Sequence, residues 1–290
     1  MSPENLAGTA RRPRSEWPIF VVGCHRSGTT LMRFILDTHP AIACAPETKL
    51  MGGLYEFSRY PQLRFALATL GVTSEQGSAE LAQLVESIMG KYAARSGKRR
   101  WADKTPNYYR ILPFIREIFA GEVLFLFVER HPFDTMTSLV EFFDQRVGVD
   151  ADPETDRISR SFGAGPYSWA RYWTEVNESI ELFRHEHPEI SHVVRYEDVV
   201  SRPDSTVGSI FDFLGENMPE DLLSQVFTAP HHLGMEDHKI RGTGAIHDRS
   251  TLRWADWKPE RIAATWRLVG PLAQTLGYTP DPAAPVVPVS

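Results

Sequence analysis

Residues able to bind an anion gather early in the chain, where a short apolar run gives way to a loop with a glycine at each end. The loop spans Gly23 to Gly28, and Thr29 and Thr30 then open an amphipathic segment. A strand, a tight loop and a helix start, in this order, aim backbone N–H groups and a helix N-terminus at an anion. The stretch therefore predicts a phosphate site, and the alternative is a plain glycine turn between strand and helix.

The loop departs from the common nucleotide-binding pattern G-x-x-x-x-G-K-[ST] at one position. Both glycines and Thr30 match, but Thr29 stands where the pattern has lysine. Kinases and NTPases of the usual type need that lysine on the β- and γ-phosphates. Here the cation lies inside the loop, at Arg26, followed by Ser27. ATP hydrolysis is therefore disfavoured, and the loop suits a nucleotide with one phosphate and one further anionic group.

Strands that alternate with helices must position this loop. Apolar runs predict strands at 19–22, 123–128 and 191–196, and the second run is apolar on both faces, as in a central parallel strand. The remaining chain predicts helices at 29–38, 50–59, 109–119, 133–144, 167–187, 202–214, 220–227 and 259–276, with further helical periodicity over 61–100. We expect 41–46 to be an extended connection and 101–106 to be irregular. The order predicts an α/β fold, with a P-loop-type, mainly parallel sheet flanked by helices and a helical insertion.

Length and composition set the domain organisation. The chain has 290 residues, of which 42% are hydrophobic, and no linker-like segment divides it. We expect one domain over 18–280, a disordered tail over 1–17 and a proline-rich tail over 281–290.

Charge and cysteine content exclude several classes of protein. A net charge of −6 argues against a general nucleic-acid or membrane-surface binder. Two cysteines argue against a disulfide-stapled secreted domain, and the sequence holds no metal-binding motif. No secretory signal and no apolar run long enough to span a membrane appear. We therefore expect a cytoplasmic protein without a metal or a nucleic-acid partner.

The run HRSGTTLMRFILDTHP, residues 25–40, resembles the 5′-phosphosulfate loop of sulfotransferases that use 3′-phosphoadenosine 5′-phosphosulfate (PAPS). It is especially similar to the tyrosylprotein sulfotransferase branch, whose pattern continues into a Glu-Thr pair, here Glu47-Thr48. The resemblance implies a PAPS-dependent sulfotransferase. Its donor-binding residues in this loop would be Arg26, Ser27, Gly28, Thr29 and Thr30.

The resemblance extends to the donor's other phosphate and covers roughly residues 18–280. Sulfotransferases hold the 3′-phosphate with an arginine at a strand end and a serine eight positions later, and Arg130 and Ser138 match this spacing. An arginine and a serine so placed can reach one phosphate, whereas Arg130 taken alone would more often be a salt-bridging strand end. Tyr196 resembles the tyrosine near the adenine, and Arg253 resembles a basic residue before tryptophan that lies near the donor phosphate.

The reaction implied is in-line transfer of a sulfuryl group to the hydroxyl of a small molecule or peptide. The acceptor would be a phenol or tyrosine, a sugar or a small metabolite. Glu47 matches the base of the tyrosylprotein enzymes, and we expect burial to raise its pKa; the alternative is that Glu47 caps the next helix. Lys104, in a Lys-x-Pro element, and Arg26 are expected on the leaving-group side. Lys104 has the alternative of pairing with Asp103.

Several alternatives stay open at this point. Many cytosolic sulfotransferases use a histidine as the base, so His25 and His131 rival Glu47, with His231 and His232 as more distant candidates. Lys239 and Arg241 form a late basic cluster with Arg253, either near the donor or in a solvated loop. A P-loop nucleotide kinase and a non-catalytic nucleotide-binding module are the alternative functions. We expect the helices at 50–100 and the segment 145–166 to line the acceptor cleft.

Overall fold

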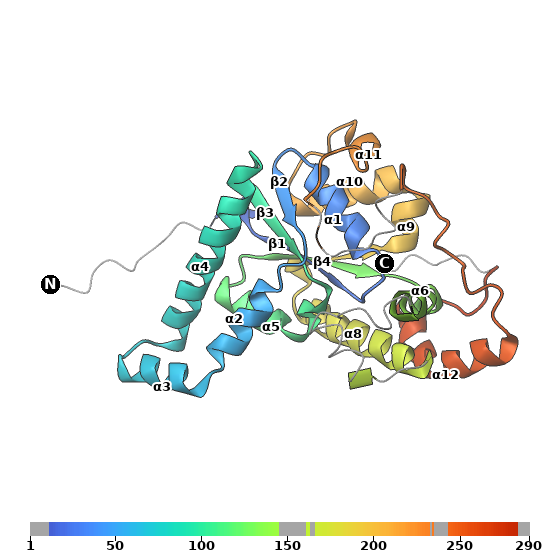
Figure 1. Cartoon of the computed structure of the whole chain (residues 1–290), viewed down its shortest axis with the longest axis horizontal. Helices are drawn as coiled ribbons and strands as arrows, with labels where there is room; N and C mark the ends of the chain where they lie inside the picture. Colours follow the sequence, from blue (N-terminus) through green and yellow to red (C-terminus); the bar gives the residue numbers. More distant parts are fainter. Residues whose placement is uncertain (1–11, 145–160, 163–165, 233, 235–242, 284–290) are drawn as a thin grey trace.

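A five-stranded, all-parallel sheet forms the centre of the computed structural model (Figure 1), which describes residues 12–144, 161–162, 166–232, 234 and 243–283. The strand order is β2-β3-β1-β4-β5. Strands β1 to β4 are buried along their whole length, as expected when helices cover both faces of a parallel sheet. The strands span Ile19–Gly23 (β1), Ile42–Ala45 (β2), Arg100–Lys104 (β3), Leu124–Glu129 (β4) and Ser191–Arg195 (β5).

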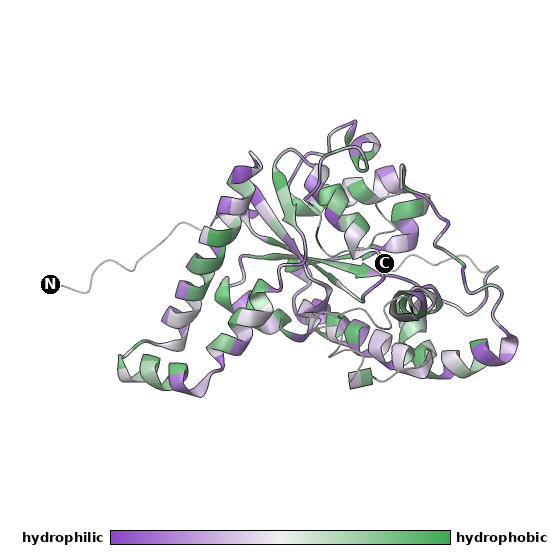
Figure 2. Ribbon diagram, viewed as in Figure 1, coloured by the Kyte–Doolittle hydropathy of each residue, from purple (hydrophilic) through white to green (hydrophobic). Residues whose placement is uncertain are grey.

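Helices enclose the sheet on both sides. Figure 1 shows α1, α9 and α10 on one side and α5 and α8 on the other, while α2, α3 and α4 form an arm at one end. Figure 2 shows apolar residues concentrated on the central strands. The helices are α1 Thr29–Thr38, α2 Leu50–Ser58, α3 Pro61–Thr69, α4 Ser74–Arg95, α5 Leu112–Ile118, α6 Pro132–Asp144, α8 Pro166–Glu186, α9 Tyr196–Ser201, α10 Pro203–Leu214, α11 Leu222–Gln225 and α12 Pro259–Thr275. Short 3-10 turns are η1 Arg14–Glu16, η2 Pro106–Arg110 and η3 Pro188–Ile190.

The predicted α/β fold with a parallel sheet is confirmed, but two of its strands were not predicted. Strand β2 lies in the segment expected to be a connection, and β3 lies in the stretch expected to be irregular. Strand β3 reads RWADK, and its charged residues are buried because distant groups satisfy them. Arg100 donates to the carbonyls of Trp17 and Leu214 at 2.8 Å each. Buried polar groups need such partners, and a local pattern does not reveal them.

The segment before β1 corrects part of the expected disordered tail. Residues 14–16 form η1, and Arg12 donates to Glu86 at 2.7 Å and to Glu122 at 3.2 Å. Trp17 is 8% exposed, and its indole N–H donates to the Arg12 carbonyl at 2.9 Å. Residues 12–17 are thus packed on the domain, while the expectations for 1–11 and 284–290 lie outside the described residues.

Candidate active site

The carboxyl ends of the five strands lie at one edge of the sheet, and each leads into a residue selected from the sequence. The glycine-bounded loop follows β1, Glu47 follows β2, Lys104 ends β3, Arg130 follows β4, and Tyr196 follows β5. Ligands of open parallel α/β sheets bind at this edge, outside the carboxyl ends of the strands. The topology therefore brings together residues that are far apart in the sequence.

The loop after β1 depends on a glycine at its last position. Gly28 has φ +104°, a conformation that side-chain-bearing residues rarely adopt. A Cβ at Gly28 would lie 2.4 Å from Cδ2 of Tyr196, so this ring lies directly against the loop. Arg26 also has positive φ, 71°, which strains a non-glycine residue and turns its carbonyl and side chain out of the usual path. Ser27 is 1% exposed, and its hydroxyl has no hydrogen-bond partner among the described residues.

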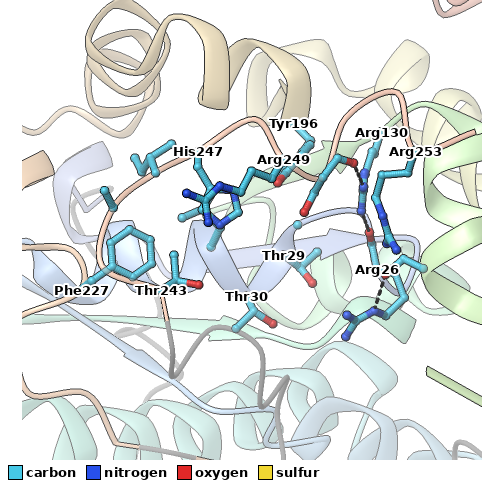
Figure 3. A pocket seen from close by; sticks show the side chains of 16 residues that line it. Arg26, Thr29, Thr30, Arg130, Tyr196, Phe227, Thr243, His247, Arg249 and Arg253 are labelled. Carbon is cyan, nitrogen blue, oxygen red and sulfur yellow. Dashed lines mark hydrogen bonds between the residues drawn. The ribbon is translucent and has the colours of Figure 1, made fainter. Parts of the chain in front are cut away.

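A cavity of about 380 Å³ opens over this loop (Figure 3). Figure 3 shows Arg26, Arg130 and Arg253 gathered at one end of the cavity and Phe227 and Thr243 at the other. Of the nine residues expected to bind the donor, Ser27 is the one that does not line the cavity. The lining consists of Arg26, Gly28, Thr29, Thr30, Leu31, Arg130, Ser138, Tyr196, Phe227, Thr243, Ala245, Ile246, His247, Arg249, Ser250 and Arg253.

Hydrogen bonds join the two predicted phosphate motifs into one unit. Arg130 Nη1 donates to the carbonyl of Arg26 at 2.7 Å, and Arg130 Nη2 donates to the carbonyl of Ser250. Arg26 Nε donates to Ser138 Oγ at 3.0 Å. The Arg130 guanidinium lies 4.7 Å from the centre of the Tyr196 ring, within cation–π range. Arg130 Nε is buried without a partner among the described residues.

A segment over residues 243–253 forms one wall of the cavity, and Asp134, which the sequence analysis missed, anchors it. Asp134, 1% exposed, accepts the backbone N–H groups of Leu252 at 3.0 Å and Arg253 at 2.7 Å. Arg253 also pairs with Glu141. The position of Asp134 in the first turn of α6 was the available signal, since acids favour helix N-termini.

Two further lining residues, His247 and Arg249, were also missed. The described part of this segment, from residue 243 to 253, is not helical or extended, so no periodicity indicates which of its side chains face the cavity. Arg253 lines the cavity as expected, whereas the expectations for Lys239 and Arg241 lie outside the described residues.

Glu47 and Lys104, expected to act in the same reaction, form an ion pair. Lys104 Nζ lies 2.8 Å from Glu47 Oε1, and the two side chains are 0% and 28% exposed. Asp103, the alternative partner of Lys104, accepts hydrogen bonds from Thr48 at 2.5 Å and from Tyr108 at 2.9 Å, and the charge of Lys104 also acts on it.

The ion pair also decides the protonation of Glu47. Burial raises the pKa of Glu47, but the nearby charges of Lys104 and His25 outweigh it, so the pKa lies below its ordinary value. The raised pKa expected from the sequence is therefore wrong, and Glu47 is an ionised carboxylate at neutral pH. The alternative role of Glu47 as a cap of α2 stays a prediction; at this helix start Thr48 Oγ1 accepts the N–H of Leu50 at 3.1 Å.

Glu47 opens onto a second cavity, of about 430 Å³, on the α2 side of the site. Helix α2 is one of the elements expected to line the acceptor cleft, and most of the segment 145–166, the other element, lies outside the described residues. The lining consists of Glu47, Lys49, Gly52, Gly53, Tyr55, Glu56, Thr105, Asn107, Tyr108, Arg110 and Ile111.

None of the four histidine candidates lines the second cavity, which Glu47 does. His131 is 6% exposed; its Nε2 lies 3.0 Å from the Thr279 carbonyl, and its Nδ1 accepts the N–H of Phe133 at 3.2 Å. Burial lowers the pKa of His131 to about 4. His231 bonds to Asp37 at 2.7 Å, away from both cavities. His25 lies beside the site, where its Nδ1 is 2.5 Å from the hydroxyl of Tyr172.

Two absences apply to the part of the chain that the structure describes. It holds no group of three or more His, Cys, Asp or Glu residues placed to bind a metal ion. Within the same ranges, no helix combines the length and the apolar character needed to cross a bilayer.

Curated relatives match most of the chain at low identity. Protein-tyrosine sulfotransferase of Drosophila melanogaster is 24% identical over 277 residues, which cover 90% of this chain and 52% of the relative. Nodulation protein NoeE of Sinorhizobium fredii is 27% identical over 289 residues, covering 89% of this chain and 65% of the relative. The chain thus spans about half to two thirds of the length of these relatives.

Solved structures share the fold. The sulfotransferase domain from the curacin biosynthetic pathway superposes with a TM-score of 0.59 at 21% identity, covering 91% of this chain and 99% of that one. A mouse sulfotransferase complexed with PAP gives a TM-score of 0.52 at 13% identity, covering 88% and 83%. The profile of the sulfotransferase family matches residues 18–220, a span that contains all five strands and both phosphate motifs. The chain therefore belongs to the sulfotransferase family.

Proposed function

We propose that this protein transfers a sulfuryl group from PAPS to a hydroxyl acceptor. The donor would bind in the arginine-lined cavity and the acceptor in the second cavity. One observation carries the proposal: a single edge of the sheet holds a cation-lined cavity over the glycine loop and, beside it, an ionised Glu47 that faces a separate cavity. Membership of the sulfotransferase family supports the reaction type.

The residues of the first cavity fit such a donor. Three arginines at one end supply positive charge for phosphate and sulfate groups, and the N-terminus of α1 adds backbone N–H groups. Arg130 lines the cavity, and its buried Nε, which has no partner among the described residues, is a group that an anion would satisfy. The ring of Tyr196, with Arg130 against it, offers a flat surface for the adenine ring of the donor.

Glu47 is the group we assign as the base. Its lowered pKa keeps the carboxylate ready to accept the acceptor's proton across the neutral pH range. A base of low pKa takes a proton more readily from a phenol, whose pKa is ordinarily about 10, than from an alcohol. We therefore propose a phenolic hydroxyl as the preferred acceptor group.

Lys104 and Arg26 are the cations we assign to the leaving-group side. When Glu47 takes up a proton, its attraction for Lys104 Nζ weakens, and the lysine charge becomes available to the oxygen that leaves sulfur. Fixed cations that meet developing charge in a partly closed site stabilise the transition state without reorganisation of solvent. Positioning of the two substrates supplies the rest of the acceleration, and the protein needs no nucleophile of its own.

Mass spectrometry of an acceptor panel incubated with PAPS tests the proposal. We expect sulfated products from phenols or tyrosine peptides, with less product from sugars and nucleosides. PAP binding without transfer to any acceptor would favour a non-catalytic nucleotide-binding module. Turnover of ATP with Mg²⁺ would favour a kinase or NTPase, which the threonine at position 29 argues against.

A further inference from the structure

Helix α2 contains two adjacent glycines, Gly52 and Gly53, as its third and fourth residues. Glycine is a much weaker helix former than alanine, so the pair destabilises α2. Packing does not explain the cost, since a Cβ at either position would meet no atom within 4 Å. Backbone conformation does not explain it, because neither residue has positive φ. What the two glycines share is that both line the second cavity.

The rest of α2 is fixed so that this bare face stays turned toward the cavity. Met51 and Leu54, on the opposite face, are 0% and 9% exposed. The N–H of Met51 donates to the hydroxyl of Tyr108 at 3.1 Å. Further along, the Tyr55 ring packs edge-on against Phe114, with centroids 5.3 Å apart. The first six residues of the helix are thus packed on the domain, and this packing leaves the glycine face toward the cavity.

We propose that Gly52 and Gly53 form the floor on which the acceptor lies, and that the absence of side chains there sets how broad an acceptor this protein takes. The inference rests on the proposed function, because it assumes that the second cavity holds the acceptor. Glu47 lines the same cavity, so a ring lying on this floor has its hydroxyl within the space that the carboxylate faces.

The size of the cavity gives the class of acceptor. A cavity of about 150 Å³ holds one benzene ring, and this one measures about 430 Å³, so it accommodates roughly three such rings. Tyr55, Tyr108 and Ile111 supply apolar surface around the bare helix backbone. A fused-ring phenol fits this volume, with its rings on the apolar surface and its hydroxyl toward the polar part of the wall, which includes Glu47.

A series of side chains at position 53 tests the floor. The protein would be assayed as Gly53→Ala and Gly53→Leu with PAPS and two acceptors, para-nitrophenol for one ring and hydroxyphenanthrene for three. We expect Gly53→Leu to lower kcat/KM for hydroxyphenanthrene about 100-fold and for para-nitrophenol less than about 5-fold, with Gly53→Ala between Leu and wild type. The Kd of PAP should stay within about twofold of the wild-type value in both variants, because Gly53 does not line the donor cavity.

Gly208 provides a matched control. It lies inside α10, a Cβ there also meets no atom within 4 Å, and it lines neither cavity. Gly208→Ala and Gly53→Ala should both raise Tm, each by about 2–4 °C. Gly208→Leu should leave both kcat/KM values within about twofold of wild type, since only the loss of cavity space is expected to affect the acceptor.

Three results overturn the inference. The first is an equal loss for both acceptors in Gly53→Leu, and the second is a loss in Gly53→Ala as large as in Gly53→Leu, which would make α2 a flexible hinge. The third comes from a binding measurement, which does not depend on sulfuryl transfer. The fluorescence of hydroxyphenanthrene is followed as the complex of the protein with PAP is added. Equal affinity for wild type and Gly53→Leu would contradict the proposal that Gly53 forms the floor of the acceptor site. If wild type binds this probe, Gly53→Leu does not, and neither transfers sulfate, the floor is supported while the proposed sulfotransferase activity fails.

Discussion

Replacing Glu47 by glutamine is the most direct test of the proposed mechanism. The variant Glu47→Gln keeps the shape and one acceptor oxygen facing Lys104 Nζ, which lies 2.8 Å from Oε1, but removes the charge and the base. Loss of a positioned general base lowers the rate about 10²- to 10⁴-fold, which corresponds to roughly 2.7–5.5 kcal/mol in the barrier. We expect kcat/KM to fall within this range while the Kd of PAP stays within about twofold of wild type.

The structure also sets the expected loss of stability. Exposed ion pairs contribute about 0–1 kcal/mol, whereas breaking a buried pair costs about 3–5 kcal/mol. This pair lies between the two cases, since Lys104 is 0% and Glu47 28% exposed. We expect a cost of about 2 kcal/mol, or about 4–8 °C in Tm, against a typical domain stability of about 5–15 kcal/mol. The variant should therefore remain folded, and its lost activity cannot be attributed to unfolding.

The pH profile of wild type gives an independent check. Burial raises the pKa of Glu47, but the charges of Lys104 and His25 lower it by more, so the pKa lies below the ordinary value of 4.5. A base with a depressed pKa stays ionised as pH falls, so kcat/KM should stay level through neutral pH and decline only below 4.5. The contribution of the Glu47–Lys104 pair to folding stability has the same pH dependence. It is fully present above pH 4.5 and is lost as pH falls through the folded-state pKa of Glu47.

Two results would refute the reasoning. One is a Glu47→Gln variant that keeps more than about half of the wild-type kcat/KM. The other is an acid limb in the wild-type profile near 6.5, the ordinary pKa of histidine, that disappears in His25→Ala, which would make His25 the base. A double-mutant cycle with Lys104→Met completes the test, because two residues acting as a unit give a combined loss smaller than the product of the single losses.

Three further predictions concern the donor site and the core. Gly28→Ala places a Cβ 2.4 Å from the Tyr196 ring at φ +104°, so we expect the Kd of PAP, measured by calorimetry, to rise at least about 10-fold; an unchanged Kd would contradict the close approach. In Arg130→Lys, the ammonium group cannot keep the hydrogen bonds of both guanidinium nitrogens or the contact with the Tyr196 ring. The affinity for PAP should therefore fall about 10- to 100-fold. A change below about threefold would argue against a contact between Arg130 and phosphate. Burial raises the pKa of Asp37, but His231 and Lys98 lower it below the ordinary 3.8, so this carboxylate stabilises the fold above 3.8 and less as pH falls through its folded-state pKa. The Tm difference between wild type and Asp37→Asn should therefore be largest at neutral pH and shrink below pH 3.8, and a pH-independent difference would refute this.

Local sequence determined the parts of the site whose residues are close together in the chain. The glycine loop between β1 and α1 was predicted because a strand, a glycine turn and a helix start are encoded by adjacent residues. The strand β4 was predicted from an unbroken apolar run, and Arg130 and Ser138 from a spacing that resembles the 3′-phosphate motif of sulfotransferases. The parallel α/β fold followed from the alternation of these elements.

Tertiary structure alone decided the partners and protonation of the charged residues and the position of the cavities. Strand β3 stayed hidden because its polar residues are satisfied by groups such as the Leu214 carbonyl, far away in the chain. The pKa of Glu47 is lowered by Lys104, which β3 places against it, so burial alone gave the wrong direction. Gly52 and Gly53 are marked out only in the folded chain, where both line the second cavity. Hydrophobic periodicity and turn chemistry act between neighbours in the sequence, whereas charge pairing, burial and cavities arise between residues that only the folded chain brings together.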